Sequence, residues 1–257
     1  MQQITEPFAT GNSFIHAAHP GVRIGCAFIY SLCGALATDL TAATSVLFGG
    51  IFFAAAARLP FFPLMRRLLV VNAFIFFLWI FLPFSRSGAP VLSIGPFTAT
   101  LEGIIYTAII TLKSNGVVLA ATALLSTMPV QLIGAGMQTL KLPEKFCRLF
   151  LFTWRYVHVM RIEFSKMHRA AVMRGFAPGT SLRTYKTYAW LLGMLLVRSM
   201  DRAQRVWQAM LCRGFTGIFH SLNTYSFCKQ DLFLLAMSTL SAAGFIFLEL
   251  NRVEVFR

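Results

Sequence analysis

Residues 24–57 decide the fold, and they read IGCAFIYSLCGALATDLTAATSVLFGGIFFAAAA. As one helix this stretch would be about 50 Å long, whereas the hydrocarbon core of a bilayer is about 30 Å thick. The polar Ala-Thr-Asp-Leu-Thr break around Asp39 therefore divides it into two membrane spans joined by a tight turn. Apolar runs of this length are typical of membrane helices rather than of soluble domains.

The rest of the chain has the same character. Of its 257 residues, 57% are hydrophobic and only 12% are charged, whereas soluble domains carry about 25% charged residues. Three further apolar segments, at 68–84, 101–125 and 232–248, are candidate spans. The sequence therefore predicts an all-α, polytopic transmembrane bundle of about five spans. Neither Lys nor Arg precedes Pro20, and no cleavage site follows a short apolar core, so no signal peptide is expected.

Positive charge is concentrated in the middle of the chain. Residues 140–214 hold fourteen of the 23 Lys and Arg residues and three acidic ones, so they carry +11 of a net charge of +14. The positive-inside rule explains such a block without any further function. The basic connection after the first two spans, with Arg58, Arg66 and Arg67, is also expected in the cytoplasm. Basic and apolar residues alternate without a recognition fold, so nucleic acid is not an expected partner.

The charge distribution predicts a topology and a division of the chain. We expect the N-terminus inside, the C-terminus outside, and everything from Ser126 to the last span in the cytoplasm. The predicted parts are a four-span membrane bundle at 1–125, a cytoplasmic helical region at 126–230, and a last span with its tail at 231–257. The segment Ser85–Pro96 is expected to be a loop on the outer side.

Two apolar segments of the basic region are not expected to cross the membrane. Phe146–Met160 contains Arg148, Arg155 and His158, and an Arg facing lipid at the bilayer centre costs several kcal/mol. Tyr188–Val197 is too short to span. Both are expected to be membrane-grazing or partly embedded helices on the cytoplasmic side.

A heptapeptide occurs twice in this region, as AAVMRGF at 170–176 and as AMLCRGF at 209–215. Each copy ends a predicted amphipathic helix with an apolar stripe, formed by Met160, Phe164, Met167 and Ala171 in the first and by Met200, Ala203, Trp207 and Met210 in the second. Gly175 and Gly214 are expected to follow these helices in the left-handed conformation. Arg174 and Arg213 in the last turns complement the negative ends of the helix dipoles.

This capping role explains either copy alone, but the repetition favours a paired docking surface. The planar fork of Arg pairs with carboxylates and carbonyl groups, so a soluble partner with acidic or carbonyl-lined clefts is expected. On the second helix Arg198, Arg202 and Arg205 form a predicted basic face, and Asp201 can pair with Arg205 at a spacing of four.

The run RSMDRAQRVWQAMLCRGF, from Arg198 to Phe215, resembles the signature of the CbiQ family. These proteins are the transmembrane T components of energy-coupling factor (ECF) transporters for cobalt or nickel. The copy that ends at Phe176 resembles the family's other Ala-Arg-Gly motif. The HPGVR segment at 19–23 is similar to the short Pro/basic element that opens many members. The likeness in layout covers almost the whole chain.

The resemblance implies an ATP-driven importer subunit without chemistry of its own. In the family, two cytoplasmic coupling helices insert their Arg residues into grooves of two ATPase subunits. By position, Arg174, Gly175, Arg213 and Gly214 would make these contacts, with Arg198, Arg202 and Arg205 supporting them. Here Met173 and Cys212 stand where the family has Ala, which affects packing rather than the role. The family also implies a substrate-capturing S component (CbiM-like or NikM-like) and a bacterial or archaeal cell membrane.

Other readings remain open. A T component of a vitamin-specific or shared ECF transporter would carry the same motifs, and cobalt and nickel are not distinguished, because another subunit selects the substrate. An intramembrane enzyme would need clustered polar groups, and only Asp39, Glu102 and Lys113 are candidates. Lys113 is expected to pair within the bundle or with a partner subunit. The five His and five Cys residues are dispersed, and there is no Walker A motif, so no metal site, cofactor or ATP hydrolysis is expected in this chain.

Overall fold

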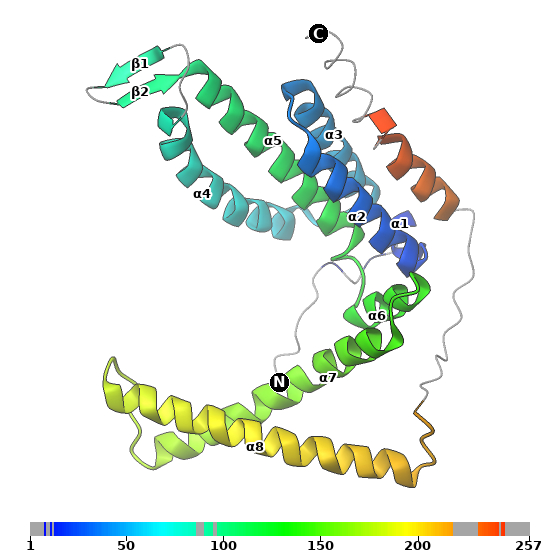
Figure 1. Cartoon of the computed structure of the whole chain (residues 1–257), viewed down its shortest axis with the longest axis vertical. Helices are drawn as coiled ribbons and strands as arrows, with labels where there is room; N and C mark the ends of the chain where they lie inside the picture. The colour runs from blue at the N-terminus through cyan, green and yellow to red at the C-terminus, as the bar shows by residue number, and fades with distance from the viewer. Residues whose placement is uncertain are drawn as a thin grey trace. The chain divides into compact units, whose positions relative to one another are not determined.

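The computed structural model describes residues 8, 11, 13–85, 90–94, 97–217, 231–241 and 243–244 (Figure 1). The chain divides into two compact units. The first comprises residues 1–144 and 225–257, and the second comprises residues 145–224.

The first unit is built from helices and one small hairpin. Its elements are α1 (Phe14–Ala17), α2 (Pro20–Leu36), α3 (Leu40–Ala56), α4 (Phe61–Ser85), β1 (Pro90–Ile94), β2 (Phe97–Thr100), α5 (Leu101–Leu124), α6 (Val130–Thr139) and a last helix, Asp231–Ser241. Helices α4 and α5 are long and apolar enough to cross a membrane, and α2, α3 and the last helix are shorter apolar helices. The predicted helical bundle is confirmed.

Two local features differ from the prediction. The antiparallel strands β1 and β2, with Ile94 opposite Phe97, occupy part of the segment expected to be a loop. Helix α4 begins at Phe61, so Arg66 and Arg67 lie within the helix instead of in a connection before it. Pro63 is compatible with this early start, because the first turn of a helix has no intrahelical partner for its N–H groups. The break around Asp39 is confirmed, since this residue is the N-cap of α3.

The core of the first unit depends on glycines at the crossing of α3 and α5. A Cβ atom on Gly50 would lie 2.4 Å from the carbonyl oxygen of Gly116, and one on Gly116 would lie 2.6 Å from the carbonyl oxygen of Val46. The two backbones therefore touch directly, as small residues allow in membrane helix packing. Tyr30 of α2 donates a hydrogen bond to the Val46 carbonyl at 2.5 Å, which joins a third helix to this crossing.

Helix α4 lies beside α5 and exposes most of its apolar surface (Figure 1). Its contacts with α5 include polar pairs: the amides of Asn72 and Asn115 donate to each other at 3.1 and 2.9 Å. The indole Nε1 of Trp79 donates to Thr111 Oγ1 at 3.1 Å. Interhelical hydrogen bonds of this kind hold helices together where lipid removes the hydrophobic driving force.

The second unit is an antiparallel pair of long helices, α7 (Glu144–Met173) and α8 (Leu182–Cys212). The segments Phe146–Met160 and Tyr188–Val197, expected to be membrane-grazing or partly embedded helices, are parts of α7 and α8. Near the middle, Arg198 of α8 forms an ion pair with Glu163 of α7. Near the connection, the rings of His168 and Tyr188 stack with centroids 6.0 Å apart.

Candidate functional site

Helix α7 ends in a Schellman motif at the first Arg-Gly-Phe sequence. The N–H of Phe176 donates to the carbonyl of Ala171 at 3.1 Å, and the N–H of Gly175 donates to the carbonyl of Val172 at 3.0 Å. These two bonds satisfy carbonyls that have no partner inside the helix.

Helix α8 ends in the same way. The N–H of Phe215 donates to the carbonyl of Met210 at 3.1 Å, and the N–H of Gly214 donates to the carbonyl of Leu211 at 3.0 Å. The repeated heptapeptide therefore produces a repeated backbone geometry.

Both glycines adopt the predicted left-handed conformation. The φ angle is 85° at Gly175 and 77° at Gly214. A Cβ atom would meet nothing within 4 Å at either position, so the requirement for glycine comes from the backbone conformation and not from a lack of space.

The Arg residues before these glycines are exposed. Arg213 is the C-cap residue of α8, and Arg174 occupies the equivalent position after α7. Within the part of the chain that the structure describes, neither guanidinium group forms a hydrogen bond or an ion pair. Each cation is thus presented at a helix end whose backbone is fixed by the cap.

An aromatic residue anchors each cap. The ring of Phe176 packs edge to face on Tyr188 of the other helix, with centroids 5.5 Å apart, and also contacts His168. The ring of Phe215 packs edge to face on Trp207 at 6.0 Å. A hydrophobic contact of this residue with the last turns commonly accompanies the Schellman motif. The Phe in both copies of the heptapeptide therefore has a structural role.

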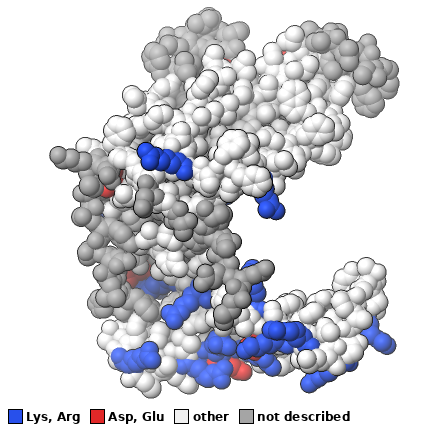
Figure 2. Space-filling model, turned by 180° about the vertical axis from the view of Figure 1, so that it is seen from behind, with Lys and Arg blue, Asp and Glu red and all other residues white. Residues whose placement is uncertain are grey.

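A basic groove of about 750 Å³ adjoins the end of α7. Its charged lining consists of Lys166, Arg174, Arg183 and Arg198. Figure 2 shows that Lys and Arg side chains gather on the surface of the helix pair. This concentration of positive charge suits an acidic or carbonyl-lined partner surface.

The three supporting Arg residues do not form a single exposed face. Arg198 Nη1 donates to Glu163 Oε1, and this hydrogen bond lowers the pKa of the Glu163 carboxyl group. Arg202 is half-buried beside α7, whereas Arg205 is exposed. Asp201, although described, does not pair with Arg205 as predicted.

The predicted apolar stripe coincides with the buried face of α7, but the stripe predicted for α8 does not coincide with the buried face of that helix. In α7, Met167 is buried and the other three stripe residues are half-buried. In α8, Met200, Ala203 and Trp207 are exposed, and the half-buried row is Leu191, Leu195, Ser199, Arg202, Val206 and Met210. Arg202 can belong to this row because its aliphatic part can cover apolar surface.

The family model for CbiQ, described as cobalt transport protein, matches residues 11–225. The chain belongs to the CbiQ family. This match includes both Arg-Gly-Phe caps, so the resemblance predicted from the motifs is confirmed. Together with the apolar helices of the first unit, it makes this CbiQ-family chain a membrane protein.

Curated relatives of this CbiQ-family chain are named either as energy-coupling factor transporter transmembrane proteins or as cobalt transport proteins. The energy-coupling factor transporter transmembrane protein EcfT of Leuconostoc gelidum subsp. gasicomitatum is 26% identical over 222 residues, which cover 81% of this chain and 82% of the relative. The cobalt transport protein CbiQ of Rhodobacter capsulatus is 27% identical over 166 residues, covering 63% and 67%. A putative fused cobalt transport protein CbiMQ of Methanocorpusculum labreanum is 26% identical over 91 residues, covering 35% and 15%.

The most buried cation of the described residues was not recognised as such in the sequence. Arg23 is 1% exposed, and its Nε donates to the Leu124 carbonyl at 3.2 Å while Nη2 donates to Thr127 Oγ1. Arg23 therefore provides hydrogen-bond donors for acceptors at and just after the C-terminal end of α5. Beside it, the backbone N–H of His19 donates to Asp231 Oδ1 at 2.6 Å, which ties α2 to the last helix. An Arg before an apolar run is typical of a cytoplasmic loop, so the sequence did not predict the burial of Arg23 within α2.

Lys113 pairs within the bundle, which was one of the two expectations for it. Its Nζ donates to the carbonyl of Ala35 at 3.4 Å, in the last turn of α2. A cation at this end of a helix interacts favourably with the helix dipole. Among the described residues, no three His, Cys, Asp or Glu side chains are grouped as a metal site would require.

Proposed function

We propose that this chain is the energy-coupling transmembrane subunit of an ECF-type importer for cobalt or nickel ions. It would connect two ATPase subunits to a separate substrate-capturing membrane subunit and would not catalyse a reaction itself. The observation that carries the proposal is the pair of identical helix caps, each presenting an exposed Arg without a partner in the described part of the chain.

The chemistry of these ends suits two copies of one partner. Arg174 and Arg213 precede glycines in the same conformation, so they present the same cation from the same backbone geometry. A guanidinium group can donate two parallel hydrogen bonds to a carboxylate or to adjacent carbonyl groups. Two equivalent ATPase subunits would offer two equivalent acceptor grooves. Their movement during ATP hydrolysis would then change the separation of the two helix ends.

The membrane part would carry this movement to the substrate-capturing subunit. In this proposal residues 1–125 and 231–257 form the membrane-embedded part, and residues 126–230 form the coupling region on the cytoplasmic side. The positive charge of the coupling region supports this orientation. The name of the fused CbiMQ relative supports a CbiM-like subunit as the membrane partner.

Charge reversal at both helix ends tests the proposal. Co-expressed wild-type chain should retain the ATPase subunits during purification, and the double variant Arg174→Glu/Arg213→Glu should lose them. The matched control is Arg155→Glu/Arg161→Glu, which makes the same charge change at exposed positions of α7. Equal retention of the ATPases by the double variant and the wild-type chain contradicts the proposal.

A shared or vitamin-specific T component is the second candidate function. It is favoured by the name of the EcfT relative, which specifies no metal, and by the large share of both chains that this match covers. Purification of the complex with its native membrane partner distinguishes the two. A CbiM-like or NikM-like partner and metal-dependent uptake support the first, whereas a vitamin-binding partner supports the second.

A further inference from the structure

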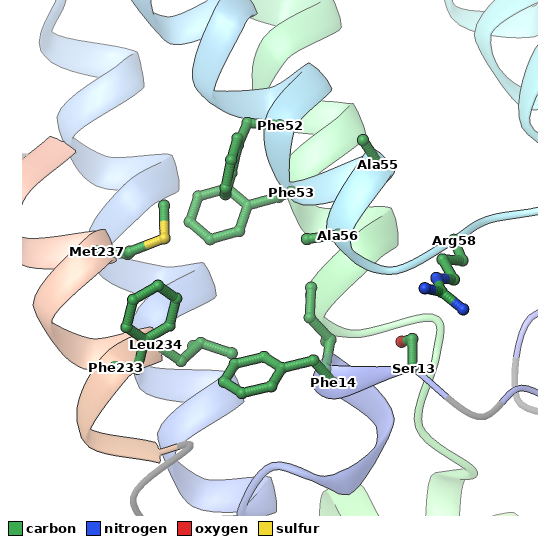
Figure 3. A pocket seen from close by; sticks show the side chains of 11 residues that line it. Ser13, Phe14, Phe52, Phe53, Ala55, Ala56, Arg58, Phe233, Leu234 and Met237 are labelled. Atoms are coloured by element: carbon green, nitrogen blue, oxygen red, sulfur yellow. The ribbon is translucent and has the colours of Figure 1, made fainter.

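The first unit contains a cavity of about 430 Å³ that the proposed coupling role does not use (Figure 3). It lies between α1, the end of α3 and the last helix. Most of its wall is apolar, with Phe14, Phe53, Phe233 and Met237 among the lining residues. Phe14 and Phe233 pack edge to face with ring centroids 5.7 Å apart. Its volume falls within the range of roughly 300–1,000 Å³ that is typical of ligand sites.

One cation, Arg58, belongs to the lining of this cavity. Figure 3 shows Arg58 and Ser13 on one side of the space and the aromatic rings of Phe14 and Phe233 on the other. The hydroxyl of Ser13 is engaged by His16 Nδ1 at 2.6 Å. The side chain of Arg58 makes no hydrogen bond or ion pair within the described residues. The cavity thus combines an apolar wall with a guanidinium group that has no partner among the described residues.

The backbone of Arg58 is in a conformation that favours glycine. Its φ angle is +50°, and it occupies the glycine position of a Schellman motif at the end of α3. The N–H of Leu59 donates to the Ala54 carbonyl at 3.4 Å, and the N–H of Arg58 donates to the Ala55 carbonyl at 3.0 Å. A side chain in the left-handed region costs energy that glycine avoids. An Arg residue at such a position points to a use for its side chain.

A second basic residue provides an internal comparison. Lys141, with φ +57°, has the same place after α6, where the N–H of Leu142 donates to the Met137 carbonyl at 3.3 Å. Lys141 does not line the cavity. The two positions therefore share a charge and a backbone conformation, and they differ in whether an apolar chamber is adjacent.

We propose that the cavity binds an acyl chain of an anionic phospholipid whose phosphate group pairs with Arg58. The apolar helix α3 ends immediately before this residue. In the proposed topology the cation therefore stands where a membrane helix meets the cytoplasmic headgroup layer, in which anionic lipids attract basic side chains. An apolar ligand without charge would leave Arg58 unused. Inorganic phosphate would leave the aromatic wall uncovered.

Lipid retention by the full chain tests this proposal. The chain, purified in detergent, is mixed with phosphatidylglycerol or with diacylglycerol of the same acyl chains, which lacks the phosphate group, and bound lipid is counted by native mass spectrometry. The wild-type chain should retain phosphatidylglycerol about tenfold better, since a hydrogen bond to a charged group changes affinity by this order. Arg58→Gly should remove the preference and Lys141→Gly should keep it. Both variants place glycine where the backbone favours it, so both should fold.

Two further arms separate the lipid from other ligands. Met237→Trp fills the chamber without changing Arg58, and it should also reduce the retention of phosphatidylglycerol. Glycerol phosphate, which has the charge and no acyl chain, should not displace the bound lipid at equal concentration. Undiminished retention by Arg58→Gly or by Met237→Trp, or displacement by glycerol phosphate, overturns the proposal.

Discussion

The two units of the molecule pack their helices in different ways. In the first, α3 and α5 approach until the backbones touch, with glycine on both sides of the contact. In the second, α7 and α8 meet through long side chains, including the Glu163–Arg198 ion pair and the stacked rings of His168 and Tyr188. Backbone contacts cannot adjust by rotamer changes, whereas long side chains can. The first unit is therefore suited to a fixed support, and the helix pair is suited to changes in the spacing of its ends.

Substitution of Gly116 should have the largest effect, because it breaks the close contact directly. In Gly116→Ala the added Cβ would lie 2.6 Å from the carbonyl oxygen of Val46, so the backbones must separate. We expect a loss of about 3 kcal/mol in unfolding free energy, measured by thermal unfolding in detergent. Gly193→Ala in α8 is the control, because nothing lies within 4 Å there and alanine should stabilise the helix by about 0.5–1 kcal/mol. Equal effects of the two variants would remove the proposed contrast between the units.

Removal of the buried cation in the first unit should have the next largest effect. Arg23→Met leaves the Leu124 carbonyl without its donor in a buried position, and an unsatisfied buried group costs about 2 kcal/mol. The same unfolding assay measures it. Arg66→Met, at an exposed position of α4, should change the stability little. A similar small effect at Arg23 would mean that its hydrogen bonds do not hold the end of α5.

A third test concerns the glycine caps of the helix pair. Gly214→Ala forces a residue with a Cβ into φ +77° and should cost about 1 kcal/mol. Amide hydrogen exchange in the last turn of α8 should become faster. Gly179, which has space around it and no positive φ, provides the control Gly179→Ala, for which we expect no change. Unchanged exchange in Gly214→Ala would show that the cap does not fix this helix end.

The smallest expected effect concerns the ion pair between α7 and α8. The hydrogen bond from Arg198 lowers the pKa of Glu163. The ion pair therefore stabilises the folded chain fully above the unfolded-state pKa of Glu, which is about 4.3. This stabilisation is lost as the pH falls through the lower folded-state value. The difference in thermal midpoint between the wild-type chain and Glu163→Gln should therefore be constant from pH 6 to 8 and vanish in acid. A difference that persists at low pH would assign the effect to packing.

The membrane helices and the helix caps could be predicted because each depends on local sequence. The length of residues 24–57 required a break, and Asp39 provided the polar residue for it. Arg-Gly-Phe predicted a left-handed glycine at both helix ends, since only the local backbone determines it.

Other features depend on tertiary contacts and could not be predicted in this way. Arg23 is buried because the end of α5 supplies acceptors for it, and these acceptors are about a hundred positions away in the sequence. The contact face of α8 differs from its most apolar stripe and includes the half-buried Arg202. Arg58 and Lys141 adopt the left-handed conformation, which Gly or Asn normally adopts after a helix. Their residue types therefore did not predict these helix ends.

We propose that each Arg end of the helix pair holds one ATPase subunit. The number of ATPase subunits in the purified complex tests this most directly. Native mass spectrometry should find two with the wild-type chain, one with Arg174→Glu or Arg213→Glu alone, and none with the double variant. Two ATPase subunits in the complex of the double variant, with the membrane chain intact, would contradict the account.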